Sequence, residues 1–131
     1  MRYVVALDAA LRLVADRLVV SSRHELLAPT LLRSELLSAL FASAGRKEID
    51  RREADARLDH FRSLKIRLLG DRVLQRVAWD MSEELGWKET MRGEYLALTK
   101  LQADAFVTLD AALAESLEGV IPLQSFEEMI S

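Results

Sequence analysis

Hydrophobic residues in this chain follow two patterns: short unbroken runs, and longer stretches in which they recur every three or four positions. Short apolar runs are typical of buried strands, and the three-to-four spacing is typical of amphipathic helices. The runs predict strands at residues 3–7, 25–28, 66–69 and 105–109, with an edge strand at 119–123. The periodic stretches predict helices at residues 9–14, 29–45, 49–64, 70–86, 92–102 and 110–117.

Strands and helices alternate along the whole sequence, which predicts an α/β protein with a central, mainly parallel sheet covered on both faces, that is, a three-layer α/β/α architecture. With 131 residues, 50% of them hydrophobic, the chain is long enough for one domain with a real core, and we expect residues 1–131 to form it. No apolar run approaches the roughly 20 residues needed to cross a bilayer, and the chain begins with a strand rather than a leader peptide. We therefore expect a soluble, cytoplasmic protein without a membrane partner.

Two of the predicted strands lead directly to an aspartate. The first strand stops at Asp8, and the strand at residues 105–109 stops at Asp110. Ligands of open α/β sheets bind outside the carboxyl ends of the strands, so both carboxylates are expected in one crevice if these strands are neighbours. Each aspartate could instead be a helix N-cap, where its side chain accepts hydrogen bonds from backbone amides.

A third acid, Glu35, lies within the amphipathic helix that follows the second strand. Alone it would be interpreted as a solvated residue, but together with Asp8 and Asp110 it completes a set of three carboxylates. Such a set suits Mg²⁺ or Mn²⁺, which are hard ions that prefer oxygen ligands. The chain has no cysteine and only two histidines, so any metal is expected to be held by oxygen.

Other common chemistries find no support in the sequence. Its five glycines form neither a Walker loop nor a dinucleotide-binding fingerprint, and no serine or histidine has the context of a nucleophile. The two tryptophans, Trp79 and Trp87, are interpreted as packing residues rather than as platforms for stacked bases.

Charge is unevenly distributed along the chain. Residues 1–76 hold 15 Lys or Arg against 10 Asp or Glu, whereas residues 77–131 hold 3 against 11. The basic residues between Arg46 and Arg72 are therefore candidates for guiding a polyanion, unless folding interleaves the two halves.

The segments that carry these acids resemble a known family. Residues 8–10, 28–40, 94–98 and 105–110 look like the PIN-domain ribonucleases, in particular the VapC-type toxins of toxin-antitoxin systems. The resemblance covers nearly the whole chain. It implies a PIN-like fold, an acidic pocket that binds Mg²⁺ or Mn²⁺ and cleaves single-stranded RNA, and a cognate antitoxin that neutralises the activity. By position, Asp8 matches the first acid of the family, Glu35 the second and Asp110 the last.

Two departures from the family pattern bear on activity. In the triplet 91–93, Arg92 stands where the family has its third acid. Glu94 lies two residues further on, but this spacing in a helix turns its side chain roughly 200° away from that of Arg92. An alternative register puts Ala6 at the first acid position and leaves Asp8 beside the site. Arg92, Glu94 and Thr108, which lies within the last motif, are auxiliary candidates.

These observations lead to two hypotheses. The first is a metal-dependent endoribonuclease of the VapC type in which Asp8, Glu35 and Asp110 are both catalytic residues and metal ligands. The second is a degenerate PIN domain that has lost catalysis because of Arg92 and serves as an antitoxin-binding or self-association module. The resemblance implies a homodimer and an antitoxin partner in both cases, and the leucines of the early helices agree with this because they exceed what one short helix buries.

Overall fold

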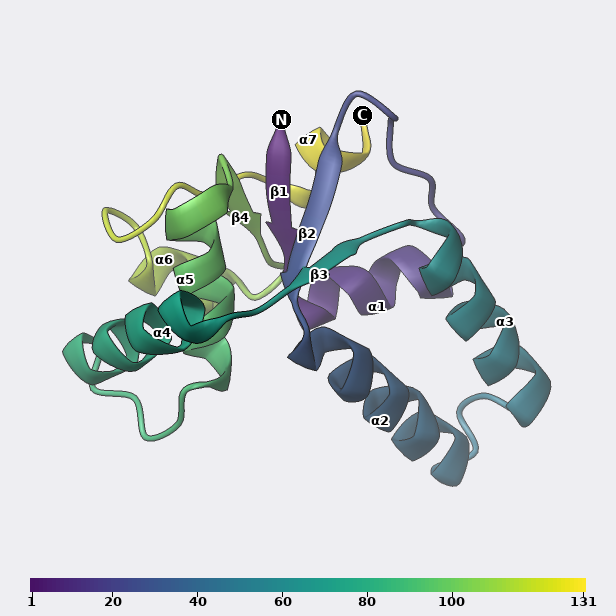
Figure 1. The fold of residues 1–131 in the computed structure, drawn as a ribbon. Coiled ribbons are helices and arrows are strands. Elements are labelled where there is room, and N and C mark those ends of the chain that lie inside the picture. The colour runs from purple at the N-terminus through teal and green to yellow at the C-terminus, as the bar shows by residue number, and fades with distance from the viewer.

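The computed structural model describes all 131 residues and contains a four-stranded sheet at its centre (Figure 1). The strands are β1 (Arg2–Val5), β2 (Glu25–Pro29), β3 (Arg67–Leu69) and β4 (Ala105–Val107). They are all parallel and lie in the order β3-β2-β1-β4. In the register, Val4 of β1 lies between Leu27 of β2 and Phe106 of β4. Consequently β1 and β4, far apart in the sequence, are neighbours whose carboxyl ends lie at the same edge.

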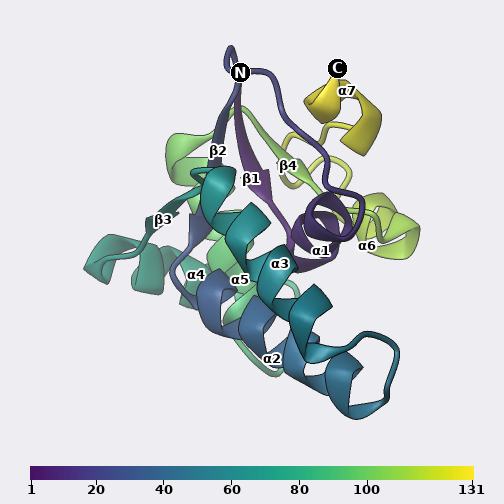
Figure 2. The same ribbon diagram turned by 90° about the vertical axis from the view of Figure 1, so that its right-hand side faces the viewer.

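Helices cover both faces of the sheet, as Figures 1 and 2 show. On one face lie α1 (Leu7–Ala15), α2 (Leu31–Gly45) and α3 (Arg51–Ser63), and on the other lie α4 (Arg72–Glu84) and α5 (Met91–Gln102). The short helices α6 (Ala111–Ser116) and α7 (Phe126–Ile130) follow β4. This arrangement confirms the predicted three-layer α/β/α architecture with a parallel sheet. None of the helices combines the length and the apolar character that spanning a membrane requires.

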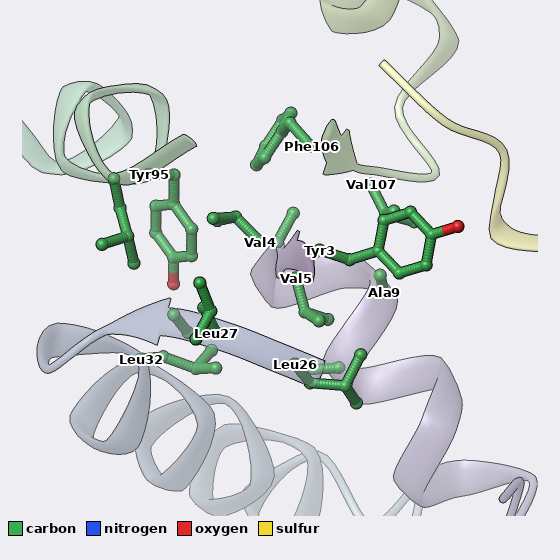
Figure 3. Packing of buried hydrophobic residues seen from close by; sticks show 14 of the residues in the cluster. Tyr3, Val4, Val5, Ala9, Leu26, Leu27, Leu32, Tyr95, Phe106 and Val107 are labelled. Carbon is green, nitrogen blue, oxygen red and sulfur yellow. The ribbon is translucent and has the colours of Figure 1, made fainter. Parts of the chain in front are cut away.

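The core lies on both sides of the sheet (Figure 3). Every residue of β4 is buried, and so are residues 3–5 of β1 and 26–29 of β2. A sheet covered on both faces buries successive side chains instead of alternate ones, which is why these strands are unbroken apolar runs in the sequence. Tyr95 of α5 enters this core next to Phe106, with its hydroxyl group on the side of Leu27 and Leu32 (Figure 3).

Three predicted boundaries are wrong. β1 ends at Val5 and β4 at Val107, each two residues earlier than predicted. The two strands stop together because Val5 and Val107 are the last paired residues, and the amide of Ala6 then donates to the carbonyl of Val107 while its own carbonyl accepts from Ala10 to begin α1. The predicted edge strand at 119–123 is reduced to a single parallel bridge between Phe106 and Leu123.

The terminal helix α7 was not predicted. It is only five residues long, and the hydroxyl group of Ser125 accepts a hydrogen bond from the amide of Glu128 at its start. The sequence does carry a signal for it, because serine followed three residues later by glutamate is a typical beginning of a helix.

Replacing Gly93 with alanine is expected to lower the free energy of unfolding by about 2 kcal/mol, the usual cost of overpacking a close contact. A Cβ atom at this position of α5 would lie 2.2 Å from the hydroxyl oxygen of Ser82 and 2.8 Å from the backbone carbonyl oxygen of Ala78, both on α4. The backbone of α4 would have to move away. Chemical denaturation of the two proteins measures the difference.

Gly45→Ala is the matched control for this substitution. Gly45 is the last residue of α2, and a Cβ atom there would have no neighbour within 4 Å. Alanine at such a position leaves stability unchanged or raises it slightly. Equal unfolding free energies for Gly93→Ala and Gly45→Ala would contradict the close packing of α4 against α5.

Candidate active site

A cavity of about 390 Å³ lies at the carboxyl end of the sheet, among α5 and the segments that follow β1 and β4. The three acids singled out in the sequence, Asp8, Glu35 and Asp110, all line it. Glu89, in the connection between α4 and α5, is a fourth acid in its lining that the sequence analysis did not select. The fold thus brings carboxylates from distant parts of the sequence to one cavity.

Asp8 lies in the first turn of α1 and not at the end of β1, contrary to the sequence-based prediction. The position directly after the strand belongs to Ala6, which also lines the cavity. One carboxylate oxygen of Asp8, Oδ2, accepts a hydrogen bond of 2.8 Å from the hydroxyl group of Thr108, while Oδ1 is buried without a partner. A carboxylate in the first turn is also stabilised by the helix dipole. The interpretation of Asp8 as an N-cap is wrong, because Ala6 is the N-cap residue of α1.

Asp110 is exposed and caps α6, so the N-cap interpretation is correct for this aspartate. Its Oδ1 atom accepts a hydrogen bond of 3.0 Å from the amide of Leu113. The backbone amide of Asp110 donates in turn to Thr108 Oγ1, at 3.1 Å. Thr108 therefore connects Asp8 and Asp110, and this hydroxyl group fixes both acids relative to the end of β4.

Glu35 of α2 is half-buried and forms a hydrogen bond across the sheet to the opposite layer. The hydroxyl group of Tyr95 on α5 donates to its Oε1 atom at 2.6 Å. Burial raises the pKa of Glu35, the hydrogen bond from Tyr95 lowers it, and the charge of Glu89 raises it; the net pKa is raised. Burial and the carboxylate of Glu35 also raise the pKa of Tyr95, so the tyrosine stays a neutral donor. Glu35 therefore takes up a proton at a higher pH than an ordinary glutamate does.

Replacing Tyr95 with phenylalanine is expected to raise the pKa of Glu35 further. The substitution removes the hydrogen bond that favours the ionised carboxylate and keeps the burial that disfavours it. Since a carboxyl group must lose its proton to bind a metal, Mn²⁺ affinity in the variant should begin to fall at a higher pH than in the native chain. A ¹³C NMR titration of the glutamate carboxyl groups measures the shift.

Tyr3→Phe is the control for this prediction. Tyr3 is also buried in the core, but in Figure 3 its hydroxyl group points away from Tyr95. Its removal should leave the pKa of Glu35 unchanged. If the pKa of Glu35 is equal in Tyr95→Phe and in the native chain, the hydrogen bond from Tyr95 to Glu35 does not form in solution.

Arg92 brings a positive charge to this acidic cavity. It lies in the first turn of α5 and lines the cavity, and its guanidinium carbon is 5.7 Å from the ring centroid of Trp87. No carboxylate of the cavity forms an ion pair with it. Glu94 does not line the cavity, although burial and the nearby charge of Glu35 raise its pKa. Glu94 therefore does not bring into the cavity a negative charge that could offset the positive charge of Arg92.

The donor set has the chemistry of a site for a hard divalent cation, but it is open. No three histidine, cysteine, aspartate or glutamate side chains come close enough together to hold one ion. Mg²⁺ does not need such a set, since it commonly keeps several waters and binds one or two carboxylates together with phosphate oxygens. The partnerless buried oxygen of Asp8 is a donor that such an ion would satisfy. The residues present thus fit a cation that shares its coordination with water or phosphate.

The basic segment from Arg46 to Arg72 is partly neutralised by ion pairs. Five of its arginines form ion pairs with nearby acids, namely Arg46 with Glu48, Arg51 with Asp55, Arg57 with Glu53, Arg62 with Asp59, and Arg67 with Glu25. All five acids belong to residues 1–76, so these pairs do not interleave the two halves of the chain, and the remaining bases of the segment, Lys47, Arg52, Lys65 and Arg72, form no ion pair.

Comparison with known proteins adds a decisive observation about the fold. No family model and no curated protein matches the sequence. Among solved structures, the crystal structure of PAE2754 from Pyrobaculum aerophilum superposes with a TM-score of 0.71 at 20% identity, over 99% of this chain and 93% of that one. VapBC2 from Rickettsia felis, bound to a DNA fragment from their promoter, superposes with a TM-score of 0.69 at 10% identity, over 95% of this chain and 98% of that one. The chain therefore has the fold of these two structures, a three-layer α/β/α PIN-like fold.

At such low identities the similarity establishes the PIN fold and leaves the chemistry to the residues of this chain. The PIN fold here carries three acids in its cavity at positions that the sequence resemblance selected. It also carries Ala6 directly after β1 and Arg92 in the first turn of α5. The cavity is thus lined by acids and also by the positively charged side chain of Arg92.

Proposed function

We propose that this chain is a metal-dependent endoribonuclease of the VapC toxin type that hydrolyses RNA phosphodiester bonds. The observation that supports it most is that Asp8, Glu35 and Asp110, from three separate elements, line one cavity at the carboxyl end of a PIN-type sheet. A cavity of this kind suits an anionic substrate only when a cation screens the carboxylates, and Mg²⁺ or Mn²⁺ would serve that purpose.

The residues of the cavity would have separate roles in metal binding and proton transfer. Asp8 would be the first ligand of the cation, held in orientation by Thr108, and Asp110 would add its second oxygen while the first caps α6. Because no three acids come close enough to hold one ion directly, Glu35, whose pKa is raised, would act on the ion through one of its waters and would accept a proton from the attacking water. A bound divalent ion would supply charge stabilisation at the phosphate and a more acidic water molecule.

We also propose an antitoxin partner and a homodimer for this chain. VapBC2, a protein of the same fold, was crystallised on promoter DNA, and its name pairs two components. In this chain, Leu37 is 54% and Phe41 80% exposed on α2, beside an apolar groove between α2 and α3 that includes Leu58 and Phe61. Exposed apolar surface of this kind suits an amphipathic segment or a second copy. Light scattering across a dilution series tests the dimer.

The nuclease proposal is tested by cleavage of a mixed-sequence single-stranded RNA. The purified chain should cleave it in the presence of Mg²⁺ or Mn²⁺ and should not do so when EDTA is added. Cleavage that persists in EDTA would contradict a metal-dependent mechanism. An absence of cleavage with either metal would remove the nuclease proposal in favour of the second candidate.

The second candidate is a catalytically degenerate PIN domain that binds an antitoxin or a second copy of itself. Arg92 favours it, because a guanidinium group in the cavity opposes cation binding. The open geometry of the carboxylates favours it as well. This candidate predicts no cleavage from the native chain or from Arg92→Asp, together with retained partner binding.

A further inference from the structure

Trp79 is not a packing residue, contrary to its interpretation from sequence. Its side chain is 64% exposed on α4, whereas Trp87 is half-buried and packs against the core. An indole ring left in water on the outer layer of a domain contributes little to folding. The position of Trp79 therefore calls for a different explanation from that of Trp87.

The two tryptophans line one shallow groove that adjoins the acidic cavity. The groove is formed by α4 and by the connection that leads to α5. Trp87 and Glu89 line both the groove and the cavity, so the two depressions lie side by side and share these side chains as a wall. On the cavity side Arg92 lies over the ring of Trp87, so Trp79 provides the free aromatic face.

The surroundings of Trp79 suit a planar polar ligand better than an apolar protein segment. Of the seven residues that line the groove, only the two tryptophans are hydrophobic, and the other five are Ser82, Glu83, Lys88, Glu89 and Thr90. A helix that docks through its apolar face needs a contiguous apolar patch, such as that around Phe41 on α2. A nucleobase, in contrast, needs one aromatic face for stacking and polar groups around its edge.

We propose that the groove formed by Trp79 and Trp87 binds an unpaired base of single-stranded RNA, with Trp79 as the stacking ring. This inference rests on the proposed function for the identity of the substrate. A nucleotide in the groove lies next to the phosphate that enters the acidic cavity, so the groove selects unpaired RNA at the point of cleavage. Since every base has a π face, the contact tolerates any sequence. It excludes duplex RNA, whose bases are already stacked on one another.

Intrinsic fluorescence tests the inference directly, because Trp79 and Trp87 are the only tryptophans in the chain. In Trp87→Phe, Trp79 is the sole reporter, and a single-stranded 12-nucleotide RNA of mixed sequence should quench its emission in a saturable manner. The titration is carried out in EDTA so that the RNA stays intact. A hairpin RNA with a fully paired stem and a minimal loop should quench it far less.

RNA affinities of variants provide a second test of the inference. With fluorescently labelled single-stranded RNA, Trp79→Ala should raise the Kd roughly 5- to 100-fold, the range expected for loss of one stacked base. Trp79→Phe should retain most of the affinity. Val73→Ala is the matched control, because Val73 is an exposed apolar residue of the same helix that does not line the groove, and its loss should leave the Kd unchanged. Thermal melting confirms that the variants are folded.

The two proposals fail in different ways. RNA binding that depends on Trp79 but is followed by no cleavage with any metal supports the groove and removes the nuclease. Cleavage by a chain whose Trp79 is not quenched, and whose Kd is unchanged in Trp79→Ala, overturns the groove and keeps the nuclease. Equal binding of single-stranded and paired RNA also overturns it. A third result would also overturn the groove proposal: Trp79→Ala loses binding of a protein partner while its RNA affinity is unchanged. The groove would then bind a protein and not RNA.

Discussion

Asp110→Asn is expected to reduce Mn²⁺-dependent RNA cleavage by roughly 100-fold or more, the size of effect seen when the surroundings of a catalytic metal are altered. The substitution replaces a charged oxygen donor by a neutral one in the cavity. It keeps the cap of α6, because asparagine caps helices as well as aspartate does and can still accept from the amide of Leu113. The loss should therefore appear in activity and metal affinity while the melting temperature stays constant.

Asp71→Asn is the matched control for this variant. Asp71 caps α4 in the same way, accepting from the amide of Leu74 at 2.8 Å, but it does not line the acidic cavity. The same chemical change is thus made at the same kind of helix position outside the site. If Asp71→Asn and Asp110→Asn lose activity equally, or if neither loses it, Asp110 is a structural cap and not a metal ligand.

Arg92→Asp is expected to raise Mn²⁺ affinity by about 10- to 100-fold and to increase cleavage with it. The change alters the local charge by two units, and at an effective dielectric of about 20 and a separation of roughly 6 Å each unit is worth about 3 kcal/mol before screening. Arg92 is exposed, so solvent and salt reduce that figure substantially. An aspartate in the first turn of α5 also suits the helix dipole, which a cation there opposes. Isothermal titration with Mn²⁺ measures the affinity.

Two further variants separate the local effect from a general one. Arg92→Gln removes the charge without adding a ligand, so its Mn²⁺ affinity should lie between those of the native chain and Arg92→Asp. Lys100→Asp makes the same two-unit change on the same helix but at an exposed position that does not line the cavity. Its effect should be small. If Lys100→Asp raises the affinity as much as Arg92→Asp, the gain comes from overall charge. If Arg92→Asp abolishes strong native cleavage, the arginine itself takes part in catalysis.

The layered architecture follows from local patterns in the sequence, and these patterns are strong here for a physical reason. A parallel sheet between two helical layers buries both faces of its strands, so residues 3–5 and 105–107 must be apolar at every position. The same geometry places the segments after the strands at one edge, where ligands gather. For that reason the sequence led to Asp8 and Asp110, which both line the cavity, although Asp8 lies in the first turn of α1 and the role of both as metal ligands stays a prediction.

The tertiary structure decided the features that depend on contacts between distant elements. Ala6, and not Asp8, follows β1 because the last pairing of this strand is with Val107, about a hundred residues away. The hydrogen bond from Tyr95 to Glu35 crosses from one helical layer to the other. Neither partner's sequence neighbourhood indicates such a bond.

The exposure of the two tryptophans was also decided by the tertiary structure. Trp79 and Trp87 lie eight residues apart and look alike in the sequence, yet one is exposed and the other packs against the core. Trp79 lies on the outer face of α4, which packs on α5, whereas Trp87 lies in the connection between these helices and turns toward the core. Periodicity indicates that a helix has an inner and an outer face, but only the packing of its neighbours determines which side chains each face leaves in water.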